Sequence, residues 1–123
     1  MATQNTSDDV KTVDILGSTW TIKYADDDPG FENANGFTND AAREITIENV
    51  KVNNDPLAFD MQSQYINQKR VLRHELIHAY LYESGLGDSS NSCEAWAVNE
   101  EMVDWFARNS PKIFATFKEL KCL

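Results

Sequence analysis

The sequence predicts an α+β fold in which a small antiparallel or mixed β-sheet is followed by three helices. Three observations lead to this expectation. The length of 123 residues suits one domain. Short segments rich in β-branched and aromatic residues come early in the chain, whereas longer segments with helical patterns fill the second half. Strands that precede helices in this way are typical of α+β domains.

The predicted strands follow from residue type and alternation. Residues 13–16 and 20–24 are rich in β-branched and aromatic side chains, and Gly17 with its neighbour suggests a hairpin turn between them. Residues 44–48 alternate polar and β-branched side chains, which predicts a strand with one buried face. A shorter strand is expected to begin at Phe37, after a turn-like Asn-Gly pair.

The predicted helices occupy the rest of the chain. One long helix is expected from about residue 60 to 84, with Gly85 contributing to its stop. Residues 76–82 are apolar nearly all round, which predicts that this helix is central in the domain. A second helix is expected from about residue 91 to 108. A third is expected to start at Pro111, since proline suits the first turn of a helix.

Composition restricts the location and the partners. We expect residues 1–10 to form a flexible N-terminus and residues 11–123 to form the single domain. The net charge of −9 argues against nucleic acid and against anionic membranes as partners. The chain has no signal-peptide pattern and no apolar run of membrane-spanning length, so a cytoplasmic location is expected. Cys93 and Cys122 would stay reduced there. The sequence gives no indication of oligomeric state.

The most informative segment is His74-Glu75-Leu76-Ile77-His78, which contains both histidines of the chain. On a helix the two imidazoles lie one turn apart on the same face, so both can bind one zinc ion. Glu75 lies beside them, where it can act as a general base toward water. The alternative is a pair of core histidines, but such rings would face a desolvation cost that zinc coordination removes.

A third protein ligand is needed, because catalytic zinc sites usually have three and keep one position open. No further histidine exists, so we expect a carboxylate, with Cys93 as the alternative. Glu94, Glu100 and Glu101 lie on the predicted second helix. Glu100 is favoured because it shares its helical face with apolar and small residues, namely Trp96, Val103 and Ala107. Glu101 falls on the more polar face, near Arg108.

Asp104 follows Glu100 by one helical turn on the same side. Histidines that bind zinc usually donate their other ring N–H to a carboxylate or a carbonyl, which fixes the tautomer. Asp104 is the candidate for that supporting role, and the alternative is an ordinary surface aspartate near the end of a helix.

Two motifs together resemble a known family. The H-E-x-x-H run at 74–78 and the N-E-x-x-x-D run at 99–104 are similar to those of the gluzincin metalloproteases, of which thermolysin is the best-known member. The layout also resembles the small zincin domains common in phage and prophage genomes. The resemblance covers roughly residues 36 to 107. It implies a zincin-like fold with one zinc held by His74, His78 and Glu100, and Asp104 supporting a ligating histidine.

The function expected from this resemblance is a zinc-dependent endopeptidase with a protein or peptide substrate and Glu75 as general base. Strand 44–48 is the predicted sheet edge along which an extended substrate would pair. Two alternatives remain open. The first is a zinc-stabilised, catalytically silent protein-binding module, an inhibitor or adaptor encoded by a mobile element. The second is a hydrolase of non-peptide amides. The oxyanion-stabilising group is unassigned, with side chains considered for it at Tyr65, Arg73, Tyr80 and Tyr82.

Overall fold

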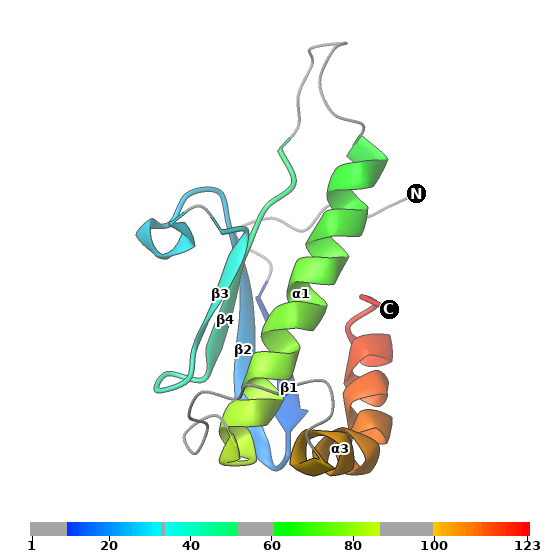
Figure 1. The fold of residues 1–123 in the computed structure, drawn as a ribbon. Helices are drawn as coiled ribbons and strands as arrows, with labels where there is room; N and C mark the ends of the chain where they lie inside the picture. The colour runs from blue at the N-terminus through cyan, green and yellow to red at the C-terminus, as the bar shows by residue number, and fades with distance from the viewer. Residues whose placement is uncertain (1–9, 33, 52–60, 87–99) are drawn as a thin grey trace.

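The computed structural model describes residues 10–32, 34–51, 61–86 and 100–123. The elements, in chain order, are β1 (Val10–Ile15), β2 (Ser18–Ala25), the short 3-10 helix η1 (Pro29–Phe31), β3 (Gly36–Asn39), β4 (Glu44–Glu48), α1 (Met61–Glu83) and α3 (Glu100–Glu119), as Figure 1 shows. Of the segment predicted to be a flexible N-terminus, the structure describes only Val10, which begins β1. None of the described helices has the length and apolar character needed to cross a bilayer.

The four strands form one mixed sheet in the order β1-β2-β4-β3. β1 and β2 make the predicted hairpin, with Ile15 opposite Ser18. Leu16 (φ 51°) and Gly17 (φ 93°) both adopt left-handed backbone conformations in its two-residue loop, as tight hairpin turns require. β4 pairs parallel to β2 and antiparallel to β3.

This strand order corrects one expectation about substrate binding. Strand Glu44–Glu48 forms as predicted, but it lies between β2 and β3 and both of its edges are paired. The prediction that it is the edge strand is therefore wrong. The edge strands of the described sheet are β1 and β3.

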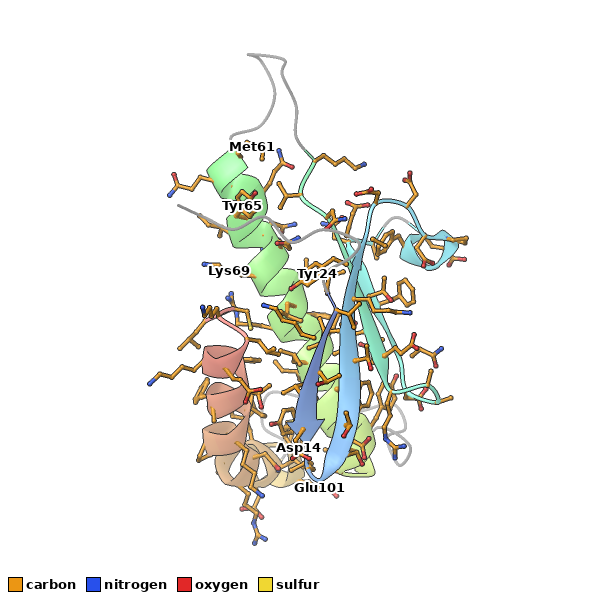
Figure 2. The ribbon with its side chains drawn as sticks, turned by 180° about the vertical axis from the view of Figure 1, so that it is seen from behind. Asp14, Tyr24, Met61, Tyr65, Lys69 and Glu101 are labelled. Atoms are coloured by element: carbon orange, nitrogen blue, oxygen red, sulfur yellow. The ribbon has the colours of Figure 1, made fainter. Side chains whose placement is uncertain are left out.

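The core lies between one face of the sheet and α1, and Figure 2 shows the strands in front of α1 when the molecule is seen from behind. Alternation along β2 turns Trp20, Ile22 and Tyr24 inward. They pack with buried residues of β4 and α1, including Ile45, Ile47, Leu72, Leu76 and Ala79. Each large side chain buried in this way contributes about 1.5–3 kcal/mol to folding.

The predicted arrangement of three helices with the H-E-x-x-H helix central is wrong. The described chain has two α-helices beside a four-stranded mixed sheet, an α+β arrangement. α3 continues through Pro111, where a third helix was expected to begin. Proline inside a helix lacks the N–H donor and crowds the preceding turn, and Figure 1 shows α3 changing direction along its length. The part after Pro111 stays helical because Ile113 and Phe117 are buried in the core.

α1 covers one face of the sheet, and part of the helix remains exposed. His74 is exposed and His78 is half-buried, although neighbouring Leu76 and Ala79 are buried. The apolar run at 76–82 could not predict which side chains of α1 are exposed. Exposure depends on which faces of the helix the sheet and α3 cover. The helix ends where Gly85 takes a left-handed conformation (φ 82°), which confirms the predicted stop.

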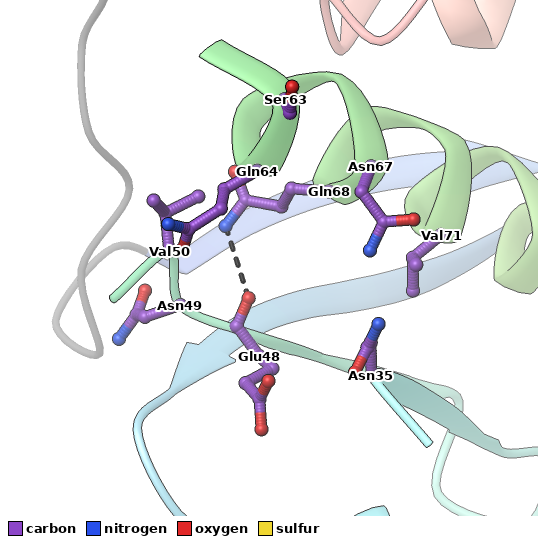
Figure 3. Close-up of a pocket in the computed structure, with 9 residues that line it drawn as sticks. All are labelled: Asn35, Glu48, Asn49, Val50, Ser63, Gln64, Asn67, Gln68 and Val71. Atoms are coloured by element: carbon purple, nitrogen blue, oxygen red, sulfur yellow. Dashed lines mark hydrogen bonds between the residues drawn. The ribbon is translucent and has the colours of Figure 1, made fainter. Parts of the chain in front are cut away.

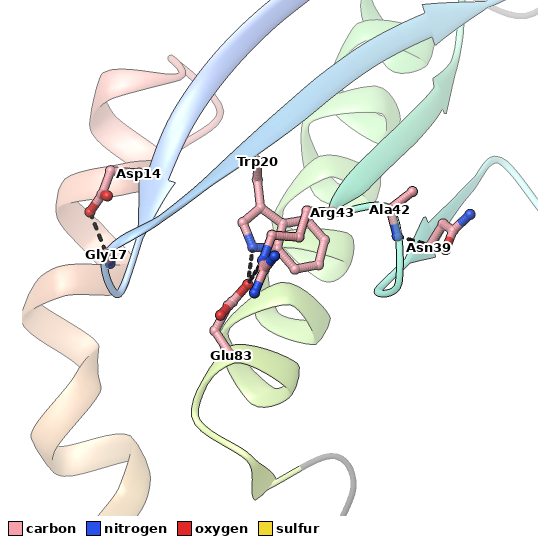
Figure 4. A network of polar contacts seen from close by, with 7 residues as sticks. All are labelled: Asp14, Gly17, Trp20, Asn39, Ala42, Arg43 and Glu83. Atoms are coloured by element: carbon pink, nitrogen blue, oxygen red, sulfur yellow. Dashed lines mark hydrogen bonds and ion pairs between the residues drawn. The ribbon is translucent and has the colours of Figure 1, made fainter.

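A polar network fixes the carboxyl end of α1 to the sheet (Figure 4). The Glu83 carboxylate accepts hydrogen bonds from Nε1 of Trp20 (2.8 Å) and from Nε of Arg43 (2.5 Å). Burial raises the pKa of Glu83, but the bonds from Arg43 and Trp20 outweigh it, so the net pKa lies below its ordinary value. Glu83 therefore joins α1, β2 and the β3–β4 turn through one ionised group.

Candidate metal site

One flank of α1 runs along the edge strand β3. Val71 and Gly36 are in close contact, since a Cβ atom added to Gly36 would lie only 2.7 Å from Cγ1 of Val71. One turn further along α1, Glu75 is buried, and its carboxylate accepts a 2.7 Å hydrogen bond from Oγ1 of Thr38 on β3. The flank that carries the H-E-x-x-H motif therefore faces the β3 side of the sheet.

The two histidines converge on a common point. Their Nε2 atoms are 3.2 Å apart, and their ring centroids are 4.9 Å apart. Two Zn–N bonds of about 2.05 Å to atoms 3.2 Å apart enclose an angle of about 103°, close to the tetrahedral value. The separation of the two Nε2 atoms thus fits two ligands of one zinc ion.

Protein contacts hold this arrangement on one side. The ring of Tyr82, one turn after His78, stacks on the His78 ring at a centroid distance of 6.3 Å. A separation of 3.2 Å also suits an N–H···N hydrogen bond between one imidazole and the lone pair of the other. In either case the two Nε2 atoms lie next to each other on one face of α1.

The predicted third ligand is not placed by the described atoms. Glu100 is the first residue of α3, and its side chain lies outside the described part of the structure. Cys93 and Glu94 lie outside it as well, while Glu101 is described and exposed. The described residues contain no cluster of three histidine, cysteine or acidic side chains that could hold a metal. The role of Glu100 stays a prediction.

Asp104 lies on an exposed part of α3. Its carboxylate is 3.8 Å from Nε of Arg108, one turn later in the helix. The adjacent Trp105 donates a 3.0 Å hydrogen bond from Nε1 to Oγ of Ser84, which joins this part of α3 to the end of α1. Neither histidine is among the described hydrogen-bond partners of Asp104, and its supporting role stays a prediction.

Two of the side chains considered for the oxyanion instead join α1 to α3 and to the C-terminal residues that follow α3. Tyr80 is buried, and its hydroxyl lies 2.6 Å from Oγ1 of Thr116. Burial raises the pKa of the Tyr80 hydroxyl above its ordinary value. Arg73 donates to the backbone carbonyl of Cys122. Tyr82 is the one that lies beside a motif histidine.

Sequence reasoning missed Thr38. Its hydroxyl is the described side-chain partner of Glu75, and the residue belongs to the edge strand. The available signal was weak, because a threonine in a short strand gives no indication of which helix it will face. Only the pairing of β3 outside β4 brings it to α1.

Comparison of the chain with protein-family models, with curated proteins and with solved structures finds no match. The resemblance to gluzincins therefore depends on the residues of the two motifs.

Proposed function

We propose that this protein is a zinc-dependent peptidase in which His74 and His78, together with Glu100, hold one zinc ion. The observation that carries the proposal is the 3.2 Å separation of the two Nε2 atoms beside a buried glutamate. That spacing suits adjacent corners of a zinc tetrahedron. A glutamate that follows the first histidine directly is the general base expected of this motif.

Zinc, when bound in such a site, lowers the pKa of water and polarises a carbonyl group. Glu75 accepts the proton from the attacking water and then delivers it to the leaving nitrogen of the cleaved peptide bond. The Thr38 hydroxyl donates to the Glu75 carboxylate at 2.7 Å, which limits the rotation of that carboxylate.

The substrate in this proposal is an extended polypeptide that pairs with β3. An edge strand offers unpaired backbone N–H and C=O groups, to which a peptide can add as a further strand. β3 takes the role first expected of strand 44–48, because it is the edge strand whose Thr38 bonds to Glu75 of the motif. A peptide on this edge would pass close to Glu75.

The test uses a Glu75→Gln variant and a mixed peptide library analysed by mass spectrometry. The wild-type protein with zinc should cleave library peptides, whereas Glu75→Gln should bind the same amount of zinc and cleave none. Glu101→Gln provides the matched control, because it removes an exposed carboxylate and should leave cleavage unchanged. A zinc-loaded wild-type protein that cleaves no peptide would refute the proposal in favour of the catalytically silent binding module.

A further inference from the structure

A polar pocket lies on the β3 side of α1. It measures about 450 Å³ and is enclosed by the carboxyl end of β4 and the first half of α1 (Figure 3). Glu48 is the charged residue among its described lining residues, and Figure 3 shows the Glu48 carboxylate pointing away from α1. Glu48 contributes its backbone carbonyl, to which Nε2 of Gln68 donates at 3.2 Å. The described wall therefore presents mainly side-chain amides, and its one carboxylate is turned away from them.

Arg70 places a guanidinium group at the edge of this pocket. Its side chain is exposed, and its Nη2 donates a 2.6 Å hydrogen bond to Oδ1 of Asn67, a lining residue. Because a guanidinium can only donate, this bond orients the Asn67 amide so that its Nδ2 can donate in turn. Figure 3 shows the side-chain nitrogen atoms of Asn67 and Asn35 pointing toward each other across the pocket. Three hydrogen-bond donor groups thus lie together on this side of the pocket.

The charge of the α1 wall is positive. Between Met61 and His74, α1 carries Lys69, Arg70 and Arg73 and no acidic residue, although the net charge of the chain is −9. The ion pairs within the described part of the chain involve other basic residues, so Arg70 has no carboxylate partner there. An unpaired guanidinium that is held in place by one amide complements a carboxylate, which can accept through both of its oxygens.

This edge of the pocket is in line with the two histidines of the motif. At 100° per residue, His74 and His78 lie about 20° to either side of Asn67 around α1. Their midpoint lies about nine residues after Asn67, which is about 14 Å along the helix axis. β3 runs along the same flank of α1. An extended chain advances about 3.3 Å per residue, so a peptide on β3 would span this distance with about four residues.

We propose that Arg70, together with the side-chain amides of Asn67 and Asn35, binds a carboxylate of the polypeptide substrate about four residues from the cleaved bond. The carboxylate belongs either to an aspartate or glutamate side chain or to the end of the substrate chain, since both offer the same acceptor oxygens. The inference rests on the proposed function for the identity of the ligand as a substrate. Binding of the carboxylate requires no cleavage, so it can be measured separately.

The test is a titration of the isotope-labelled, zinc-loaded wild-type protein with N-acetyl-glutamate N-methylamide, followed by NMR of the side-chain signals. The amide signals of Asn35 and Asn67 should shift with this probe. N-acetyl-glutamine N-methylamide, in which a neutral amide replaces the carboxylate, should bind about fivefold more weakly, the effect of one partly exposed ion pair. N-acetyl-alanine carries only a terminal carboxylate, so tighter binding of this third probe at the same signals would identify the chain end as the source.

Arg70→Gln should weaken the glutamate probe by a similar factor. Lys69→Gln is the matched control, because it removes the same charge from the neighbouring exposed residue on another face of α1, and it should leave binding unchanged. Equal binding of the glutamate and glutamine probes, or equal effects of the two substitutions, would overturn the inference. So would shifts confined to the ring signals of His74 and His78. Carboxylate binding at Asn67 in a protein that cleaves no library peptide would refute the proposed function alone.

Discussion

The close approach of β3 to α1 at Gly36 can be tested by adding a single methyl group. In Gly36→Ala the new Cβ would lie 2.7 Å from Cγ1 of Val71, 3.1 Å from Cδ1 of Ile47 and 3.2 Å from the backbone oxygen of Thr46. Overpacking of this kind costs about 1–3 kcal/mol. Loss of the glycine's freedom in the unfolded chain offsets about 0.4–1 kcal/mol of that. We therefore expect a net loss of about 1–2 kcal/mol in the free energy of unfolding.

The assay is a double-mutant cycle with Val71→Ala, measured by urea unfolding. Val71→Ala alone should cost about 1 kcal/mol, because the side chain is half-buried and loses two carbons. In that background the 2.7 Å contact is gone while the contacts at 3.1 and 3.2 Å remain, so Gly36→Ala should cost at least about 1 kcal/mol less than in the wild type. The coupling should be at least 1 kcal/mol, above the usual error of such cycles. Additive effects of the two substitutions would refute the close packing of β3 on α1.

Three other predictions test separate parts of the structure. Because the folded pKa of Glu83 lies below its ordinary value of 4.5, its contribution to stability is present at neutral pH and is lost as pH falls through the folded pKa. Glu83→Gln should thus cost about 1–2 kcal/mol at pH 7, and this cost should shrink as pH falls below 4.5 through the folded pKa, as measured by urea unfolding over that pH range. Thr38→Val should lower kcat of peptide cleavage about tenfold without changing KM or zinc content, and Thr38→Ser should restore it, because only the hydroxyl holds Glu75; equal activity of Thr38→Val and the wild type would contradict this. Burial raises the pKa of the Cys122 thiol to about 11, so in a Cys93→Ser variant iodoacetamide at pH 8 should react slowly with the folded protein and rapidly in urea; equal rates would contradict this.

The strands could be predicted because their signal is local. Inward-facing side chains alternate along β2, and Ile45 and Ile47 do so along β4, so two-residue periodicity was enough. The order of the strands was not predictable in this way. β4 pairs with β2 although β3 lies between them in the sequence. The residues of strand 44–48 do not indicate that both of its edges are paired.

The helix boundaries were likewise not predictable from local sequence alone. A serine followed by proline is typical of a helix start, but Ser110-Pro111 lies within one continuous helix. The deciding interaction is tertiary, because Ile113 and Phe117 pack into the core beyond the proline. In the candidate site, the placement of His74 and His78 together on one face of the helix was predictable from their spacing of one helical turn. Thr38 required knowledge of the sheet, and a ligand from α3 depends on how that helix packs.

The most direct test of the metal site is the zinc content of the purified protein measured beside Glu100→Ala and Glu101→Ala, all at equal concentration and after dialysis against zinc. We expect one zinc per chain in the wild type and in Glu101→Ala, and clear loss in Glu100→Ala. Full retention in Glu100→Ala would contradict the assignment of the third ligand. An absence of zinc from all three proteins would contradict the metal site itself and leave His74 and His78 as a hydrogen-bonded pair.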